Sequence, residues 1–465
     1  MRSGDTLEIA ASSLGPEGEG LAVHEGVTVH VPRAFPGERA QVRIAHVSRQ
    51  HPRAHAELRA LLEPHPERRP SPCVHHFDPG GEPGTKSGSK PGAIACTGCA
   101  LLSLAVPAQR ALKQQLLKNH YGLEVDRVVA APEEFGYRWS SKRVVGGKAG
   151  ALILGSYMQG SHILAPMHAC RVDHPEIVLA AEELRRVADS LAIEPYDERS
   201  GSGDLRYAWF KTDGQQLLLT LVTAREDSRA ASELPERLRR PIGIAWSLQP
   251  GPGNNLRGQP PVILRGAAEL NFTIADTPLA VGPLGFLQPN PTVAALAYHD
   301  LVAGPTGDEP PTGELAFDLY AGPGVTTQLL RRHFTEVRAC EAYPESAAQL
   351  GLPPERAEDF LARQQTTERP SLVIANPPRE GLGPRVCAAL LQLAPQRLHI
   401  MSCGPAGLAR DLAALASGYR MLGLRAYDTL PQTPHVELVA WLERLGEPGS
   451  EPGSEPGSEP VPEDS

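Results

Sequence analysis

The alternation of apolar runs with helical segments between residues 315 and 441 is the strongest constraint on the fold of this chain. Residues 315–320 form an apolar run, a Gly-Pro-Gly turn follows, and a helical pattern over 325–333 precedes the next apolar run at 337–341. Strands that alternate with helices in this way build a parallel, doubly wound α/β sheet. The carboxyl ends of its strands meet at one edge, where open α/β sheets bind their ligands. We therefore expect the functional residues at this edge.

Cys403 is the first candidate at that edge. It ends the apolar run 398–402, and Gly404 and Pro405 break the strand immediately after it. A thiol placed there could act as a nucleophile, whereas the alternative is a small buried residue at a strand end.

The first turn of this region favours a nucleotide-like ligand. The glycines of residues 321–324 lack the side chains that would block a close approach of the backbone. Glu341 follows roughly 20 residues later, at the end of the second strand, where a carboxylate can accept hydrogen bonds from a ribose diol. The fingerprint G-x-G-x-x-G does not occur here. The pattern therefore favours a Rossmann-like methyltransferase sheet over a dehydrogenase.

The amino-terminal 62 residues predict a small β-barrel of the TRAM or OB type, because short alternating runs are separated by Gly and Pro turns. Residues 18–22, 29–32 and 35–39 resemble the TRAM domain found at the front of RNA-modifying enzymes. Its positive charges would face RNA or form an ordinary solvated surface. They are Arg33, Arg39, Arg43, Arg49, Arg53 and Arg59.

Four cysteines have spacings that suit a metal site. Cys96 and Cys99 form a C-x-x-C pair that can chelate one metal ion, and Cys73 and Cys170 would complete a four-sulfur shell. Spacing does not separate zinc from an iron–sulfur cluster. Residues 77–92, rich in Gly, Pro and Ser, predict a mobile surface loop.

A helix is expected from Pro107 to about Gly122, with basic or polar side chains that would face either RNA or solvent. These side chains are Arg110, Lys113, Gln114 and Lys118. Residues from about 125 to 290 predict an α+β domain that ends at Gln288 and Asn290, just ahead of a further helix. Polar residues at such a position usually cap the helix.

Composition limits the class of protein. The 465 residues can form two or three domains, and a net charge of −9 excludes a globally basic nucleic-acid binder. Seven cysteines, an odd number, do not suggest a secreted disulfide framework. No apolar run approaches the about 18 residues of a membrane span, and the start lacks a signal peptide. We expect a soluble cytoplasmic monomer with a disordered acidic tail.

Taken together, motifs from nearly the whole chain resemble the RNA uracil-C5 methyltransferase family. These motifs are residues 318–324, 376–381, 402–405 with 408–411, and 428–437. The resemblance implies that Cys403 adds to C6 of uracil and that Glu437 removes the C5 proton. It also implies S-adenosylmethionine as methyl donor, a [4Fe–4S] cluster on Cys73, Cys96, Cys99 and Cys170, and an rRNA or tRNA substrate. The residues implied for binding the donor are Gln288, Tyr320, Glu341 and Asn376.

The chain departs from the family pattern in its first glycine turn, at Ala321 and Val325, and at Asn376, where Asp is usual. Two alternatives follow: an exocyclic-amine methyltransferase that uses the Asn-Pro-Pro motif, or an RNA-binding protein with impaired catalysis. The expected domains are the barrel (1–62), the central α+β domain with the cysteines (63–290), the methyltransferase domain (291–445) and the tail (446–465).

Overall fold

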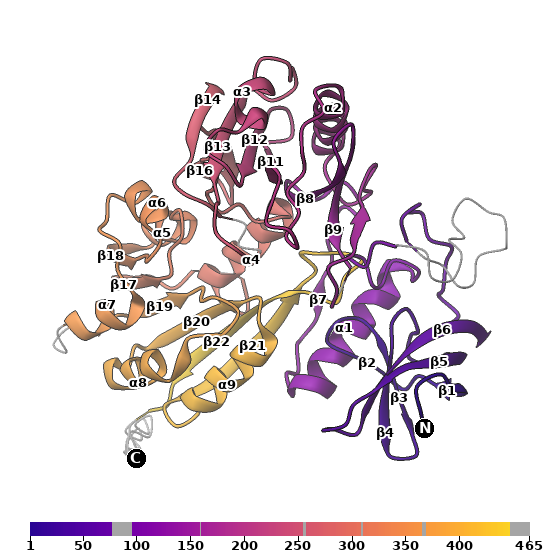
Figure 1. The fold of residues 1–465 in the computed structure, drawn as a ribbon. Helices are drawn as coiled ribbons and strands as arrows, with labels where there is room; N and C mark the ends of the chain where they lie inside the picture. The colour runs from indigo at the N-terminus through magenta and orange to yellow at the C-terminus, as the bar shows by residue number, and fades with distance from the viewer. Residues whose placement is uncertain (77–94, 159, 254–256, 308–309, 365–368, 447–465) are drawn as a thin grey trace, which may run out of the picture.

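The computed structural model describes residues 1–76, 95–158, 160–253, 257–307, 310–364 and 369–446. The predicted loop 77–92 and the predicted tail beyond 446 lie outside these residues. The fold has three parts, with the amino-terminal barrel and the carboxyl-terminal sheet on either side of helix α1 and the central domain beside them (Figure 1). None of the helices in the described ranges is both long enough and apolar enough to cross a bilayer.

The first part is a six-stranded sheet in the order β1-β5-β6-β4-β3-β2. Its strands are β1 (Thr6–Ala10), β2 (Ser13–Leu14), β3 (Gly20–His24), β4 (Val27–Val31), β5 (Arg39–Val47) and β6 (Arg53–Glu63). Val42 and Ile44 on β5 point into the domain core, while Arg39 and Arg43 lie on the exposed face. This alternation follows from the two-residue period of a strand. The predicted barrel-like domain is therefore consistent with the structure.

Helix α1 (Val106–Tyr121) joins the barrel to the carboxyl-terminal domain. Its end is set by Gly122, which takes a left-handed conformation at φ 70°. Leu112 and Leu116 pack with Phe35 of the barrel, whereas Leu117 belongs to the core of the carboxyl-terminal sheet. Lys113 is fully buried rather than on a polar surface, so the sequence-based expectation for this residue was wrong.

The central domain is a seven-stranded sheet in the order β10-β9-β8-β11-β12-β13-β14. Its strands are β8 (Ser140–Lys148), β9 (Ala151–Tyr157), β10 (Leu164–Pro166), β11 (Leu205–Thr212), β12 (Leu217–Thr223), β13 (Gly243–Leu248) and β14 (Val262–Gly266). Helices α2 (Pro175–Ser190) and α3 (Arg229–Glu233) pack on one face. On the other face, Lys211 Nζ donates to the carbonyl oxygens of Gly282 and Pro283, both at 2.6 Å. These bonds connect the central domain to the segment that leads into the carboxyl-terminal domain.

The carboxyl-terminal domain is a mixed sheet in the order β18-β17-β19-β20-β22-β21-β7. Its strands are β7 (Val128–Val129), β17 (Gly313–Leu319), β18 (Phe334–Cys340), β19 (Leu372–Ala375), β20 (Arg397–Ser402), β21 (Tyr419–Tyr427) and β22 (Glu437–Arg444). Only β22 runs antiparallel to its neighbours among these described strands. Strand β7 comes from the stretch assigned to the central domain, so the chain enters this sheet before it builds the central one.

Helices cover both faces of this sheet, which gives the three layers expected of a doubly wound fold. One face carries α7 (Ala357–Arg363), α8 (Gly383–Leu393) and α9 (Pro405–Leu415). The other carries α4 (Pro291–Ala303), α5 (Val325–Leu330) and the hairpin β15 (Leu270–Ile274) to β16 (Thr277–Val281), and α6 (Pro344–Gln349) follows β18. The predicted fold class is confirmed.

Candidate active site

Cys403 and Glu437 lie next to each other at the carboxyl edge of the parallel strands. Strands β20 and β22 are antiparallel neighbours, and their register pairs Ser402 with Leu438. Cys403 follows Ser402 and Glu437 precedes Leu438, so the register places the two residues across from each other. Both strands are almost wholly buried between two apolar cores, and this fixes the register because a slip by one residue would move each side chain into the core on the opposite face, which is packed around other side chains.

Arg379, in the loop after β19, supplies a positive charge to this pair. Burial raises the pKa of the Cys403 thiol and the charge of Glu437 raises it further, while the charge and hydrogen bond of Arg379 lower it. Burial also raises the pKa of Glu437 to about 8, again opposed by Arg379. A thiol at such a site can serve as a nucleophile, and a carboxyl group with a pKa of about 8 can serve as a proton acceptor.

Two glycines and one aspartate position the loop that carries Arg379. A Cβ atom at Gly404 would collide with the carbonyl oxygen of Arg379, and one at Gly407 would crowd the same oxygen. The carboxylate of Asp411 accepts hydrogen bonds from the backbone N–H groups of Leu382 (2.7 Å) and Gly383 (3.2 Å). Helix α9 therefore holds this loop against the end of β20.

A second group of candidates surrounds the glycine turn after β17. Tyr320 and Gly322 have left-handed backbone conformations, at φ 60° and 56°. Glu341 Oε2 accepts a hydrogen bond from Gly322 N (2.8 Å) and its Oε1 accepts one from Tyr343 N (2.6 Å). Each carboxylate oxygen keeps further acceptor capacity. The predicted pairing of the glycine turn with an acid at the end of the second strand is thus present in the structure.

Asp318 lies under this turn and was not assigned a role from sequence. It is fully buried and accepts hydrogen bonds from the hydroxyl groups of Thr326 (2.8 Å) and Thr327 (2.6 Å), which begin α5. Burial raises its pKa to about 6. These bonds join the turn to the helix that follows it.

Asn376 and Gln288, the other two candidates for binding a ligand, come from different elements. Asn376 follows β19, and its backbone N–H donates to the carbonyl oxygen of Leu319 (3.2 Å), next to Tyr320. Gln288 is buried and its Nε2 donates to the hydroxyl of Tyr298 (3.4 Å). Burial raises the pKa of Tyr298 to about 12, with a contribution from the charge of Glu437. The cap of α4 is supplied by Asn290, not Gln288, which leaves Gln288 available for the site.

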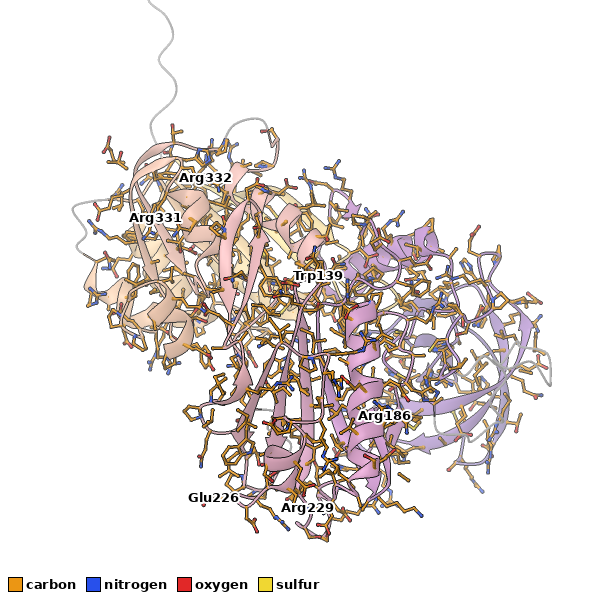
Figure 2. All side chains as sticks on the ribbon, turned by 90° about the horizontal axis from the view of Figure 1, so that it is seen from above. Trp139, Arg186, Glu226, Arg229, Arg331 and Arg332 are labelled. Atoms are coloured by element: carbon orange, nitrogen blue, oxygen red, sulfur yellow. The ribbon has the colours of Figure 1, made fainter. Side chains whose placement is uncertain are left out.

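Trp139 fixes the segment that contains Gln288 to the central domain. Figure 2 shows Trp139 near the middle of the molecule, where the central and carboxyl-terminal domains meet. Its backbone N–H donates to the carbonyl oxygen of Pro289 (2.8 Å), and its carbonyl oxygen accepts from Thr212 N (3.0 Å). The indole packs against Phe272. The position of Gln288 thus depends on both domains.

The four predicted metal-ligand cysteines line one pocket. Cys96 and Cys99 come from one segment and Cys73 and Cys170 from two others, and all four share this pocket with Arg138. Burial raises the pKa of Cys73, Cys96 and Cys99, and the four thiols influence one another electrostatically. As positioned, no three His, Cys, Asp or Glu side chains within the described ranges form a metal-binding group.

The donor set nevertheless fits a metal ion or cluster. Four thiolates match the shells of structural zinc and of iron–sulfur clusters, and the charges of Arg138 and Arg171 favour thiolates nearby.

Sequence reasoning missed several residues that shape the site. Arg379 and Asp411 stand inside recognisable motifs, but their partners come from other elements. Lys113 was taken as a surface cation, and Gln432 lies inside the motif 428–437 but was given no role of its own.

The order of this sheet, with a single antiparallel strand beside β20, and its carboxyl-edge site define a class I methyltransferase fold. A solved structure of the same fold is that of the Pyrococcus abyssi tRNA (uracil-54, C5)-methyltransferase in complex with S-adenosyl-L-homocysteine. It is 22% identical, has a TM-score of 0.71, and the alignment covers 94% of this chain and all of that one.

Curated relatives match over nearly the whole length. An uncharacterized RNA methyltransferase of Geobacter sulfurreducens is 28% identical over 95% of this chain and 90% of its own. An uncharacterized RNA methyltransferase of Synechocystis sp. is 29% identical over 95% of this chain and 96% of its own. No protein-family model matches the chain. These similarities confirm the resemblance to RNA methyltransferases that the motifs indicated.

Proposed function

We propose that this protein transfers a methyl group from S-adenosylmethionine to C5 of a uridine in RNA, by way of a temporary covalent bond between Cys403 and C6 of the base. The observation that carries the proposal is the β20–β22 register, which sets a thiol opposite a carboxyl group at the ligand-binding edge. The similarity to RNA methyltransferases supports RNA as the substrate class.

The residues meet the demands of this chemistry. Uracil C5 is a weak nucleophile, so the thiol of Cys403 first loses its proton to solvent and the thiolate adds to C6. The electron pair of the C5–C6 double bond moves toward O4 and makes C5 enolate-like. C5 then takes the methyl group, and the sulfonium sulfur of the donor keeps the bonding pair. Glu437 removes the C5 proton, the double bond re-forms, and the Cys403 thiolate leaves.

The donor would be held beside the glycine turn. Glu341 suits a ribose diol, and Gly322 leaves the backbone open to a close approach. We assign Tyr320 and Asn376 to the same site because they border the turn. We assign Gln288 to it because its partner Tyr298 is near enough to Glu437 to feel its charge. Asn376 keeps a hydrogen-bonding group where a carboxylate is usual in the family.

The four cysteines would hold a [4Fe–4S] cluster, with zinc as the alternative. Such a group would supply structural cross-linking of the segments around residues 73, 96 and 170 and takes no step in methyl transfer.

The barrel would contribute to RNA binding, although its charge is partly neutralised. Arg39 forms ion pairs with Glu8 (3.4 Å) and Glu63 (2.5 Å), and Arg59 pairs with Glu57 (2.6 Å). We propose an rRNA or a tRNA as the substrate, and sequencing of the trapped RNA distinguishes the two.

Mechanism-based trapping tests the proposal. The protein is mixed with methyl-labelled S-adenosylmethionine and cellular RNA containing 5-fluorouridine, and run on a denaturing gel. Fluorine at C5 cannot leave as a proton, so the covalent adduct should persist. We expect a labelled adduct with the unaltered protein and with Cys387→Ala, a buried cysteine of α8, but none with Cys403→Ala.

Sequencing of the trapped RNA names the uridine. The absence of an adduct together with methylation of an exocyclic amine would instead indicate the amine-methylating alternative. RNA binding with neither product would indicate the non-catalytic one.

A further inference from the structure

The segment that precedes Glu437 is held by buried contacts from α1, outside the methyltransferase domain. Lys113 of α1 is fully buried, and its Nζ donates to Asp428 Oδ1 (2.5 Å) and to the carbonyl oxygens of Leu430 and His435 (both 3.2 Å). These three bonds use the three donors of the ammonium group. The two ends of the segment 428–435 are therefore tied to one side chain of α1.

Gln432 anchors the middle of the same segment. It is fully buried and has a left-handed backbone conformation, φ 72°, which a non-glycine residue adopts only when its surroundings impose it. Its backbone N–H donates to Gln109 Oε1 (2.9 Å), and its Oε1 accepts from Gln109 Nε2 (2.7 Å). The two glutamines thus form a reciprocal pair between α1 and the segment.

The cysteine-bearing region also holds Gln432. Its carbonyl oxygen accepts a hydrogen bond from the backbone N–H of Leu101 (2.9 Å), two residues after Cys99, and its Nε2 donates to the carbonyl oxygen of Glu134 (3.3 Å). Tyr137 donates to the carbonyl oxygen of Pro431 (2.7 Å).

Burying a lysine and straining a backbone are both unfavourable, so these features are expected where geometry must be fixed. The segment contains no candidate for the reacting groups and leads directly to Glu437 at the start of β22. Cys403, by contrast, is placed by β20 and α9, whose apolar side chains share a core with Leu117 of α1.

We propose that Gln109 and Gln432, supported by Lys113, are positioning residues for Glu437. They fix the position of its carboxylate relative to C5 of the bound uracil, and so they control proton removal and release of the covalent intermediate. The inference rests on the proposed function and deepens it. It also gives α1, which lies outside the methyltransferase domain, a specific part in catalysis.

The test separates formation of the covalent intermediate from its release. Formation is followed with RNA containing 5-fluorouridine, because no variant can release the covalent adduct with this RNA. Release is followed in single turnovers with ordinary uridine RNA from cells that lack this protein, as the decay of the adduct on a denaturing gel.

The variants are Gln109→Ala and Gln432→Gly. Glycine accepts the left-handed backbone, so Gln432→Gly removes the side-chain bonds without adding backbone strain. Gln115→Ala is the matched control, because Gln115 is an exposed glutamine on the same helix.

We expect Gln109→Ala and Gln432→Gly to form the adduct within about threefold of the unaltered rate and to release it at least about tenfold more slowly, so that it accumulates on ordinary RNA. The pH profile of release should shift in both variants, and Gln115→Ala should match the unaltered protein.

Release at the unaltered rate would overturn the inference. An equal loss of formation and release would also overturn it, since it would show a purely structural role. If the unaltered protein forms no adduct at all, the proposed function itself fails, which is a distinct result.

Discussion

The guanidinium of Arg379 lies close enough to Cys403, at the end of β20, for its positive charge to lower the pKa of the thiol. It also faces Glu437, so one cation lies beside the nucleophile and the proton acceptor. Its charge favours the ionised form of both groups, against the burial that favours their neutral forms.

Replacing Arg379 with Gln should make Cys403 less reactive. Loss of the cation raises the pKa of the thiol, so the thiolate fraction at pH 8 should fall by about three- to tenfold, the effect of roughly half to one pKa unit. Alkylation by iodoacetamide, followed on the Cys403 peptide by mass spectrometry, measures this. Arg385→Gln, an exposed arginine on α8, is the control. Equal alkylation rates in both variants would show that Arg379 does not act on the thiol.

The release step should depend on the ionisation of Glu437. Its pKa is raised to about 8, so the carboxyl group is protonated below this pH and can accept the C5 proton only above it. Single-turnover release should therefore rise about tenfold per pH unit below pH 8 and level off above it. Glu437→Gln should remove this dependence and slow release by about 10²-fold or more. A release rate that is flat from pH 6 to 9 in the unaltered protein would contradict the role of Glu437.

Much of the methyltransferase sheet could be predicted because its elements have clear local boundaries. The apolar run 398–402 before Cys403, ended by Gly404 and Pro405, became β20, which begins one residue earlier, at Arg397. The same holds for α1, which has Pro107 in its first turn and Gly122 as its C-cap.

What could not be predicted depends on contacts between distant segments. Strand β7 has two residues and no periodicity, yet it extends the sheet by pairing with β21. Lys113 looks like any surface lysine until Asp428, far along the chain, is brought beside it. The position of β22 between β20 and β21, which creates the Cys403–Glu437 pair, is also a tertiary property that neither strand encodes alone.

Gly404→Ala should impair the site without unfolding the domain. The added methyl group would collide with the carbonyl oxygen of Arg379 and displace its loop from Cys403. Because small displacements of reacting groups are costly, adduct formation should fall by about 10²-fold. Gly251→Ala is the control, since a Cβ there meets no atom within 4 Å. Unchanged adduct formation in Gly404→Ala, with an unchanged melting temperature, would show that close packing of these loops is not required.

The cysteine pocket leads to a prediction about bound metal that does not depend on activity. Cys73, Cys96, Cys99 and Cys170 line one pocket, whereas Cys387 is buried apart from them on α8. Protein purified without oxygen should therefore contain iron and sulfide, or zinc. Replacing any one of the four cysteines with Ser should remove at least about half of the bound metal, whereas Cys387→Ser should leave the metal content unchanged.

Sulfide analysis distinguishes the two possibilities, because zinc alone carries none. Since Leu101 donates to Gln432 directly after the C-x-x-C pair, loss of the metal should also loosen the segment 428–435. Hydrogen exchange at Gln432 N–H, which α1 now protects, should then become faster in Cys99→Ser than in Cys387→Ser. Full metal content in all four variants would rule out a shared site in this pocket.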